Sequence, residues 1–181
     1  MMMEYKDVLT FWFDELTPSD WFSGGASIDA VIAKRFTQLH AAAAAGELSS
    51  WRECAQGRLA EVIVLDQFSR NLYRDQVGAF SCDPMALVLA QECIALKLDA
   101  ALSTQERTFL YMPFMHSESI VIHERAVKLF AQNGVESTLD FEQRHQAIIA
   151  RFGRYPHRND ILGRLSTQEE IEFLTQPGSS F

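Results

Sequence analysis

The sequence predicts an all-α fold of layered antiparallel helices with no β-sheet. Apolar residues recur every three or four positions along almost the whole chain, which is the period of an amphipathic helix. Residues that favour helix starts precede these segments, and the connections between them are short. Val62–Leu65 has the composition of a strand, but no alternating segment could pair with it, so we interpret it as buried helix.

The N-terminal part predicts two helices. Residues 5–16 carry apolar side chains at helical spacing until Thr17-Pro18 interrupts the pattern. Trp21-Phe22 leads into Ser23-Gly24-Gly25, which predicts a loop. Ser27 is expected to cap a second helix, which ends by Gly46.

The central part predicts three more helices. The Ser-x-x-Glu form of a capping box, in which two side chains bind otherwise unpaired backbone amides, begins at Ser50, Ser103 and Ser166. A helix through Leu59 and Asp66 follows the first of these, and Asp83-Pro84 has the residues of the next helix start. The helix that begins at Ser103 is expected to end near residue 112, because Pro113 lacks the amide that would continue it.

The remaining helices extend towards the C-terminus. Ser117 is expected to cap a helix that stops at Asn133-Gly134, and Ser137 a helix that stops at Gly153. Short helices are expected as far as Leu174, before a frayed tail.

The 181 residues predict one domain, residues 1–181, with an ordered core at about 5–175. A hydrophobic fraction of 48% excludes a disordered chain. A chain of this length buries enough surface to fold without a disulfide or a structural metal.

The charge and the cysteines predict a cytoplasmic protein. The net charge of −8 lacks the positive field that draws proteins to nucleic acids or anionic membranes, so we expect neither partner. There is no run of about 18 apolar residues, and residues 1–7 lack the basic and apolar regions of a signal peptide, so we expect neither a membrane span nor a signal peptide. The three cysteines lack CxxC spacing and are expected to be buried, reduced thiols.

The common cofactor and metal motifs are absent. The chain contains no GxGxxG, GxxxxGK[ST] or GxSxG sequence. His123-Glu124 begins like HExxH, but Val127 stands where the second histidine would be. We therefore expect no cofactor and no metal.

Three segments alternate charged or amide residues with large apolar ones: residues 65–74, 109–118 and 151–159. Such side chains are expected to be partly buried, and a partly buried charge needs a partner. Asp66 and Arg70 are four residues apart and can pair on one helix face. Residues 141–164 also contain five arginines against two carboxylates, which predicts either a solvated or internally paired face or an anion site.

Four ordered motifs, which read FWF, LDQFSRN, FLYMPFMHSE and RFGRYPHRN, resemble the bacterial family called domain of unknown function 924. The resemblance covers about residues 8–174 and implies an all-helical fold with tetratricopeptide-like packing, but no established reaction. Ser69 and His123 depart from the family pattern, in which Pro and Gln are usual, so no essential role is expected for either. The polar pattern of the family falls on Asp66, Gln67, Arg70, Asn71, His116, Glu118, Glu124, Arg125, His145, Arg154, His157, Arg158 and Asn159.

Our leading hypothesis is a pocket that binds a small anionic ligand or a peptide carboxylate. Arginine forks and the turn at residues 153–159, followed by a helix start at Asn159, are suited to an anion. The expected ligand-binding residues are Arg70, Asn71, His116, His145, Arg154, His157, Arg158 and Asn159, and the carboxylates expected to hold the arginines are Asp66, Glu118 and Glu124.

Two alternatives remain open. The protein could be a hydrolase that uses His116, His145 or His157 as a base, with Glu142 orienting His145, although no nucleophile is evident. It could also be a helical scaffold for protein partners, in which the polar cluster only holds helices together.

Overall fold

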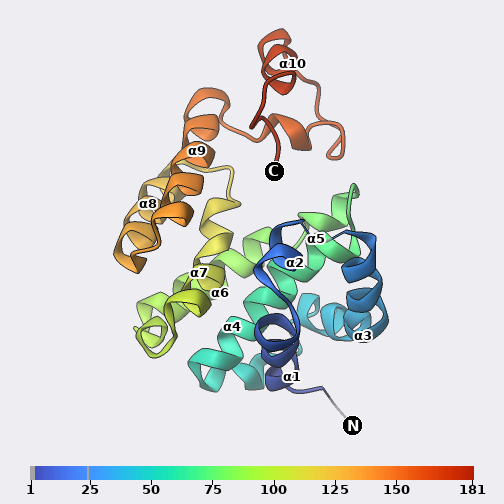
Figure 1. Cartoon of the computed structure of the whole chain (residues 1–181), viewed down its shortest axis with the longest axis vertical. Coiled ribbons are helices and arrows are strands. Elements are labelled where there is room, and N and C mark those ends of the chain that lie inside the picture. The colour runs from blue at the N-terminus through green and yellow to red at the C-terminus, as the bar shows by residue number, and fades with distance from the viewer. Residues whose placement is uncertain (1–2, 24) are drawn as a thin grey trace.

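The computed structural model describes residues 3–23 and 25–181, and within these ranges the protein contains helices and turns but no strand. The all-α prediction is therefore confirmed (Figure 1). The α-helices are α1 (Tyr5–Thr10), α2 (Pro18–Ser23), α3 (Ala26–Ala44), α4 (Ala55–Ile63), α5 (Ser69–Leu72), α6 (Asp83–Ala95), α7 (Thr104–Met115), α8 (Ile120–Asn133), α9 (Glu136–Phe152) and α10 (Gln168–Leu174).

Helix α4 lies at the centre of the main hydrophobic core. It packs against α1, α6 and α7, while α3 packs against α5 (Figure 1). Every residue from Leu59 to Ser69 is buried, so the interpretation of Val62–Leu65 as buried helix is confirmed. The aromatic ring of Trp12 contacts those of Phe68 and Phe109 beside this helix. Such ring contacts add to the stability of the fold beyond the contribution of the buried area.

Two π-helical turns interrupt the regular α-helix. Residues Phe11–Glu15 extend α1, and residues Val64–Phe68 join α4 to α5. A π-turn shifts the side chains that follow it around the helix axis and often occurs at functional sites. The second π-turn contains Asp66 and Gln67, both of which are buried.

The predicted helix cap at Ser103 is confirmed, and the other predicted caps are displaced. Ser103 and Glu106 form the predicted capping box. The last helix uses Thr167 and Glu170 instead of the pair that begins at Ser166. The first predicted box is wrong, because residues Ser49–Glu53 form a 3₁₀ turn and α4 starts after it.

Five other predicted boundaries also differ. Ser23 belongs to α2 and not to the predicted loop, and Gly24 of that loop lies outside the described residues. Helix α3 starts after Gly25 and not at Ser27. Helix α7 continues through Pro113 to Met115. The proline falls in the last turn of α7, where its missing amide removes only one hydrogen bond. Helix α8 starts after Ser119 and α9 after Val135, each two residues from the predicted cap.

The C-terminal part has a small hydrophobic cluster of its own. Ile148, Ile149 and Tyr155 are buried there, with Phe152 and Phe173 packed against them. Consecutive helices α7, α8 and α9 contact one another and connect this cluster to the main core (Figure 1).

Residues Val77–Ala95 are the one described segment that is long and apolar enough to cross a membrane. The segment is not one continuous helix, because a 3₁₀ turn at Val77–Ala79 precedes α6. Asp83 within it is paired with Arg70. Length and apolar composition alone are weak evidence for a membrane span, since core helices of soluble proteins share them.

Candidate ligand-binding site

A cavity of about 470 Å³ lies between the start of α6, the end of α7, the start of α8 and the turn that follows α9. This volume is within the range of small-molecule sites. Most of its wall is apolar. The cavity is lined by Val77, Phe80, Ser81, Asp83, Pro84, Leu87, Pro113, His116, Ser117, Glu118, Ser119, Ile122, Arg158 and Leu162.

Asp66 is fully buried behind this cavity and binds three side chains. Its carboxylate lies 2.7 Å from His116 Nδ1 and 3.1 Å from Arg70 Nη1, and it accepts a hydrogen bond from the Gln67 amide. Burial alone would raise the pKa of Asp66, but Arg70 and His116 lower it to about 2. Asp66 is therefore ionised at neutral pH.

Arg70 connects two carboxylates. Its guanidinium pairs with Asp66, as the four-residue spacing predicted, and also donates two hydrogen bonds to Asp83, at 3.0 and 3.1 Å. The role of Asp83 was missed in the sequence, where it had the appearance of a helix cap. In the structure Cys82 is the N-cap of α6, and the Asp83 carboxylate binds arginine.

His116 lies between Asp66 and the cavity. Because Asp66 is an ionised acceptor, Nδ1 of His116 carries the hydrogen and Nε2 carries the lone pair. Burial and the positive charge of Arg70 lower the pKa of His116, so its ring is neutral at pH 7. Nε2 forms no hydrogen bond with the described residues.

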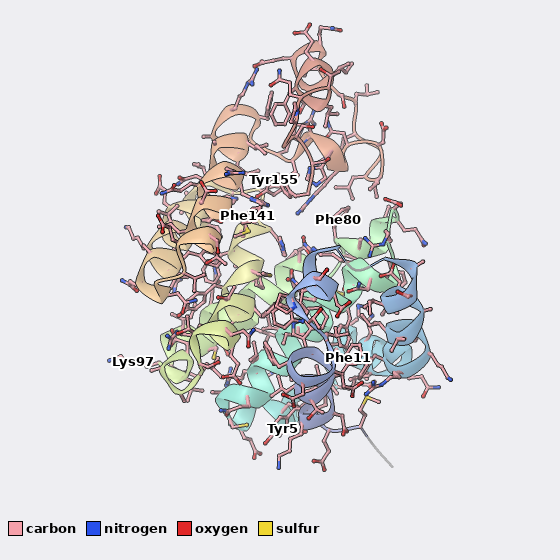
Figure 2. The ribbon with its side chains drawn as sticks, in the orientation of Figure 1. Tyr5, Phe11, Phe80, Lys97, Phe141 and Tyr155 are labelled. Atoms are coloured by element: carbon pink, nitrogen blue, oxygen red, sulfur yellow. The ribbon has the colours of Figure 1, made fainter. Side chains whose placement is uncertain are left out.

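Arg158 is buried at the cavity with few partners. The residue is only 5% exposed, and its guanidinium lies 4.5 Å from the ring centroid of Phe80 and 4.6 Å from that of Tyr155. Figure 2 labels both aromatic residues, Phe80 before α6 and Tyr155 after α9. Its nearest carboxylate is Asp83, at 3.4 Å, and its buried Nε has no hydrogen-bond partner among the described residues. Burial, followed by the repulsion of Arg70, lowers the pKa of Arg158.

The other four arginines of residues 141–164 are paired at shorter distance. Each has a carboxylate within 2.5 to 2.8 Å: Arg144 with Asp140, Arg151 with Glu169, Arg154 with Glu170 and Arg164 with Glu118. The prediction of ion pairs within the protein therefore describes these four, and Arg158 differs in that its pair with Asp83 is longer, at 3.4 Å.

Glu118 joins the turn after α9 to the start of α8. Its carboxylate accepts hydrogen bonds from the guanidinium of Arg164 and from the backbone amide of Tyr155. Burial raises the pKa of Glu118, but Arg164 and the Tyr155 amide lower it overall. Glu118 holds Arg164, which the sequence did not single out, instead of Arg154 or Arg158.

Five predicted site residues lie away from the cavity. Asn71 donates to Asp29, Arg154 pairs with Glu170, and His145 binds the carbonyl oxygen of Phe141. Asn159 binds Ser166 and Arg164, and no α-helix begins at Asn159 as had been expected. Glu124 is exposed and pairs with none of the arginines within the described ranges.

His157 is adjacent to Arg158 in the chain but does not line the cavity. Its ring packs against Tyr155 and Phe181, and its buried Nδ1 has no partner in the described part of the protein. Burial lowers the pKa of His157 to about 4.

A second buried network lies behind Ser117. Glu142 lies 2.7 Å from His123 Nδ1, while His123 Nε2 lies 2.9 Å from the Ser117 carbonyl oxygen. The expected pairing of Glu142 with His145 is therefore wrong, because Glu142 faces α8. His123, to which the sequence assigned no essential role, fixes the backbone next to His116.

The described residues contain no group of three His, Cys, Asp or Glu side chains arranged for a metal ion. Cys54, Cys82 and Cys93 are free thiols; Cys82 and Cys93 are buried, whereas Cys54 is only half-buried.

This geometry defines an all-α protein in which a charged cluster closes one side of a largely apolar cavity. The chain belongs to the family described as "Bacterial protein of unknown function (DUF924)", whose profile matches residues 8–178. The resemblance inferred from the four motifs is thereby confirmed.

Comparison with solved structures identifies one similar protein. It is a protein of unknown function, ATU0120, from Agrobacterium tumefaciens, with 39% sequence identity and a TM-score of 0.89. The similarity covers 94% of this chain and 96% of that one. The search of curated proteins found no match.

Proposed function

We propose that the cavity binds a small ligand with a carboxylate group on an otherwise apolar body, and that Arg158 binds the carboxylate. The single observation that supports this is the unusual state of Arg158: it is 5% exposed, and its hydrogen-bonding capacity is largely unused by the described residues. A buried charge without full pairing costs stability. A ligand carboxylate would supply the missing partner for a guanidinium fork.

The cavity wall favours a monoanion over a highly charged ligand. Asp83 and Glu118 also line the cavity and would repel a dianion such as phosphate. The apolar residues Phe80, Leu87 and Ile122 suit an aliphatic or aromatic body. A metabolite carboxylate and the C-terminal carboxylate of a short peptide share this chemistry.

The cellular setting is proposed on the same physical grounds. The net charge of −8 favours a small ligand over nucleic acid or an anionic membrane, and free thiols suit the reducing cytoplasm.

The proposal is tested by thermal unfolding with paired ligands. Butyrate, phenylacetate and N-acetyl dipeptides are compared with their neutral amides and with inorganic phosphate. We expect some carboxylates, but neither their amides nor phosphate, to raise the melting temperature. A ligand at about 100 times its Kd adds about 2.7 kcal/mol to the free energy of unfolding.

Two variants make the test specific. Arg158→Gln is expected to abolish the stabilisation, whereas Arg144→Gln, which removes an exposed arginine of α9, is expected to retain it. Equal stabilisation by acids and amides, or undiminished stabilisation in Arg158→Gln, would contradict the proposal.

A further inference from the structure

We infer that His116, oriented by Asp66, acts as a general base in this cavity and hydrolyses a carboxylic ester whose acid part also carries a free carboxylate. This inference rests on the proposed function, since Arg158 must hold that carboxylate. It assigns a reaction to the cavity and a separate role to each of its charged groups.

The first argument is the geometry of the imidazole–carboxylate pair. Nδ1 of His116 lies 2.7 Å from Asp66, and Asp66 is itself held by Arg70 and Gln67. A histidine with one nitrogen bound to an ionised carboxylate keeps its lone pair on the other nitrogen. That nitrogen, Nε2, belongs to a side chain that lines the cavity.

The second argument is that this base and the anion-binding arginine line the same cavity. His116 and Arg158 come from segments 42 residues apart in the chain, yet both face the space between α6 and α8. A base is effective when binding energy from another part of the substrate places the reacting bond within its reach. The apolar side chains of Phe80, Leu87 and Leu162 line the same space and suit the apolar part of such a substrate.

The third argument is the protonation state. Burial and Arg70 keep the pKa of His116 below its usual value of 6.5, so the neutral base is the main form at pH 7. The charged groups that face His116 are Asp66, Arg70 and Asp83, and all three are engaged with one another. The protonated ring formed during reaction is stabilised by Asp66.

The chemistry needs no residue as nucleophile, which is consistent with the absence of an evident one. Nε2 of His116 removes a proton from water as the water oxygen bonds to the ester carbonyl carbon. The tetrahedral intermediate then breaks its carbon–oxygen bond to the alcohol, and the imidazolium returns the proton to the leaving oxygen. One ester and one water give one carboxylic acid and one alcohol.

The experiment uses the mono-4-nitrophenyl esters of succinic and glutaric acids, which carry the free carboxylate. 4-Nitrophenyl butyrate and pentanoate, which lack it, are the matched neutral esters. We expect the purified full chain to hydrolyse the charged esters faster than the neutral ones. The rate should rise with pH along one titration whose midpoint lies below about 6.5.

Three variants separate the roles. His116→Gln is expected to lower kcat by about 100-fold or more, while carboxylates still stabilise the protein. Arg158→Gln is expected to raise KM for the charged esters and to leave the neutral esters unchanged. His145→Gln, a buried histidine away from the cavity, is expected to keep wild-type activity.

Asp66→Asn provides the test of orientation. An asparagine amide can donate to Nδ1, so the lone pair moves there and Nε2 carries the hydrogen. We expect kcat to fall as in His116→Gln, and circular dichroism establishes whether this variant folds. If it does not fold, His116→Gln and the pH profile carry the test.

The outcomes distinguish the two proposals. If no carboxylate stabilises the protein, the proposed function fails. If carboxylates bind but wild-type hydrolysis of the charged esters is no faster than that of His116→Gln, binding stands and the inference of catalysis is wrong. If His116→Gln is inactive, carboxylates still bind to it and His145→Gln is active, the inference is supported.

Discussion

Arg70 and Arg158 both approach the carboxylate of Asp83, but their pairing differs. Arg70 donates two hydrogen bonds to Asp83 and forms a further ion pair with Asp66. Arg158 reaches Asp83 at 3.4 Å and leaves its Nε unpaired among the described residues. Removing Arg70 leaves two carboxylates without their main partner, whereas removing Arg158 leaves Asp83 paired.

This difference predicts that substitutions of the two arginines change the free energy of unfolding by very different amounts. Arg70→Met should lower the free energy of unfolding by about 3–5 kcal/mol, because uncompensated buried charges remain. Arg158→Met should leave it within about 1 kcal/mol of wild type or raise it, because a methionine packs well against Phe80 and Tyr155. Urea denaturation measures both values. A loss of several kcal/mol in Arg158→Met would show that this arginine is structural and not reserved for a ligand.

At the scale of elements, the start of α4 is fitted closely to the 3₁₀ turn Ser49–Glu53. A Cβ atom added at Gly57 would lie 1.9 Å from the carbonyl oxygen of Trp51. That oxygen belongs to the backbone, so relief of the clash requires one of the two elements to move. Glycine at this position therefore allows the first turn of α4 to pack directly against the backbone of Trp51.

Gly57→Ala is therefore expected to lower the free energy of unfolding by about 1–3 kcal/mol or more through overpacking. Gly25→Ala is the control, because a Cβ there meets nothing within 4 Å. Its effect should be less than about 1 kcal/mol. Equal effects of the two substitutions in urea denaturation would contradict the close contact at Gly57.

At the scale of the whole molecule, the packing keeps most histidines neutral. Of the 5 histidines in the chain, burial lowers the pKa of His40 and His116, of His145 to about 3 and of His157 to about 4. Arg154 together with other hydrogen bonds lowers the pKa of Glu170 to about 2, the same direction and value as for Asp66.

These shifts predict a stability that declines in acid in two stages. The histidines bind protons first in the unfolded chain, so their contribution is complete above pH 6.5 and is lost as the pH falls towards their folded pKa values. Asp66 and Glu170 contribute above their unfolded pKa values of 3.8 and 4.5, and this contribution is lost as the pH falls to about 2.

Urea denaturation at a series of pH values measures this dependence. The free energy of unfolding should fall by at least about 2 kcal/mol between about pH 7.5 and pH 5, before the carboxylates titrate. A constant stability down to about pH 5 would show that the histidines are not held in their neutral form.

The sequence predicted that polar residues from distant segments meet at one site. It did not predict correctly which residues form that site. His116 and Arg158 both line the cavity, and Asp66 and Arg70 lie behind it, paired with each other and, through Asp66, with His116. The pairing of Asp66 with Arg70 was predictable because it spans one helical turn. Asp83 was missed because its local sequence is equally suited to a helix start.

The sequence by itself determined the helices, the approximate positions of their ends and the pairing within one helix turn, because periodicity, capping and four-residue spacing act between near neighbours in the chain. Only the tertiary structure decided which arginine remains underpaired. The contacts that settle it, Arg164 with Glu118 and Arg158 with Asp83, join residues 46 and 75 positions apart. Such partners are determined by how the helices pack, and the local sequence around each residue does not predict that packing.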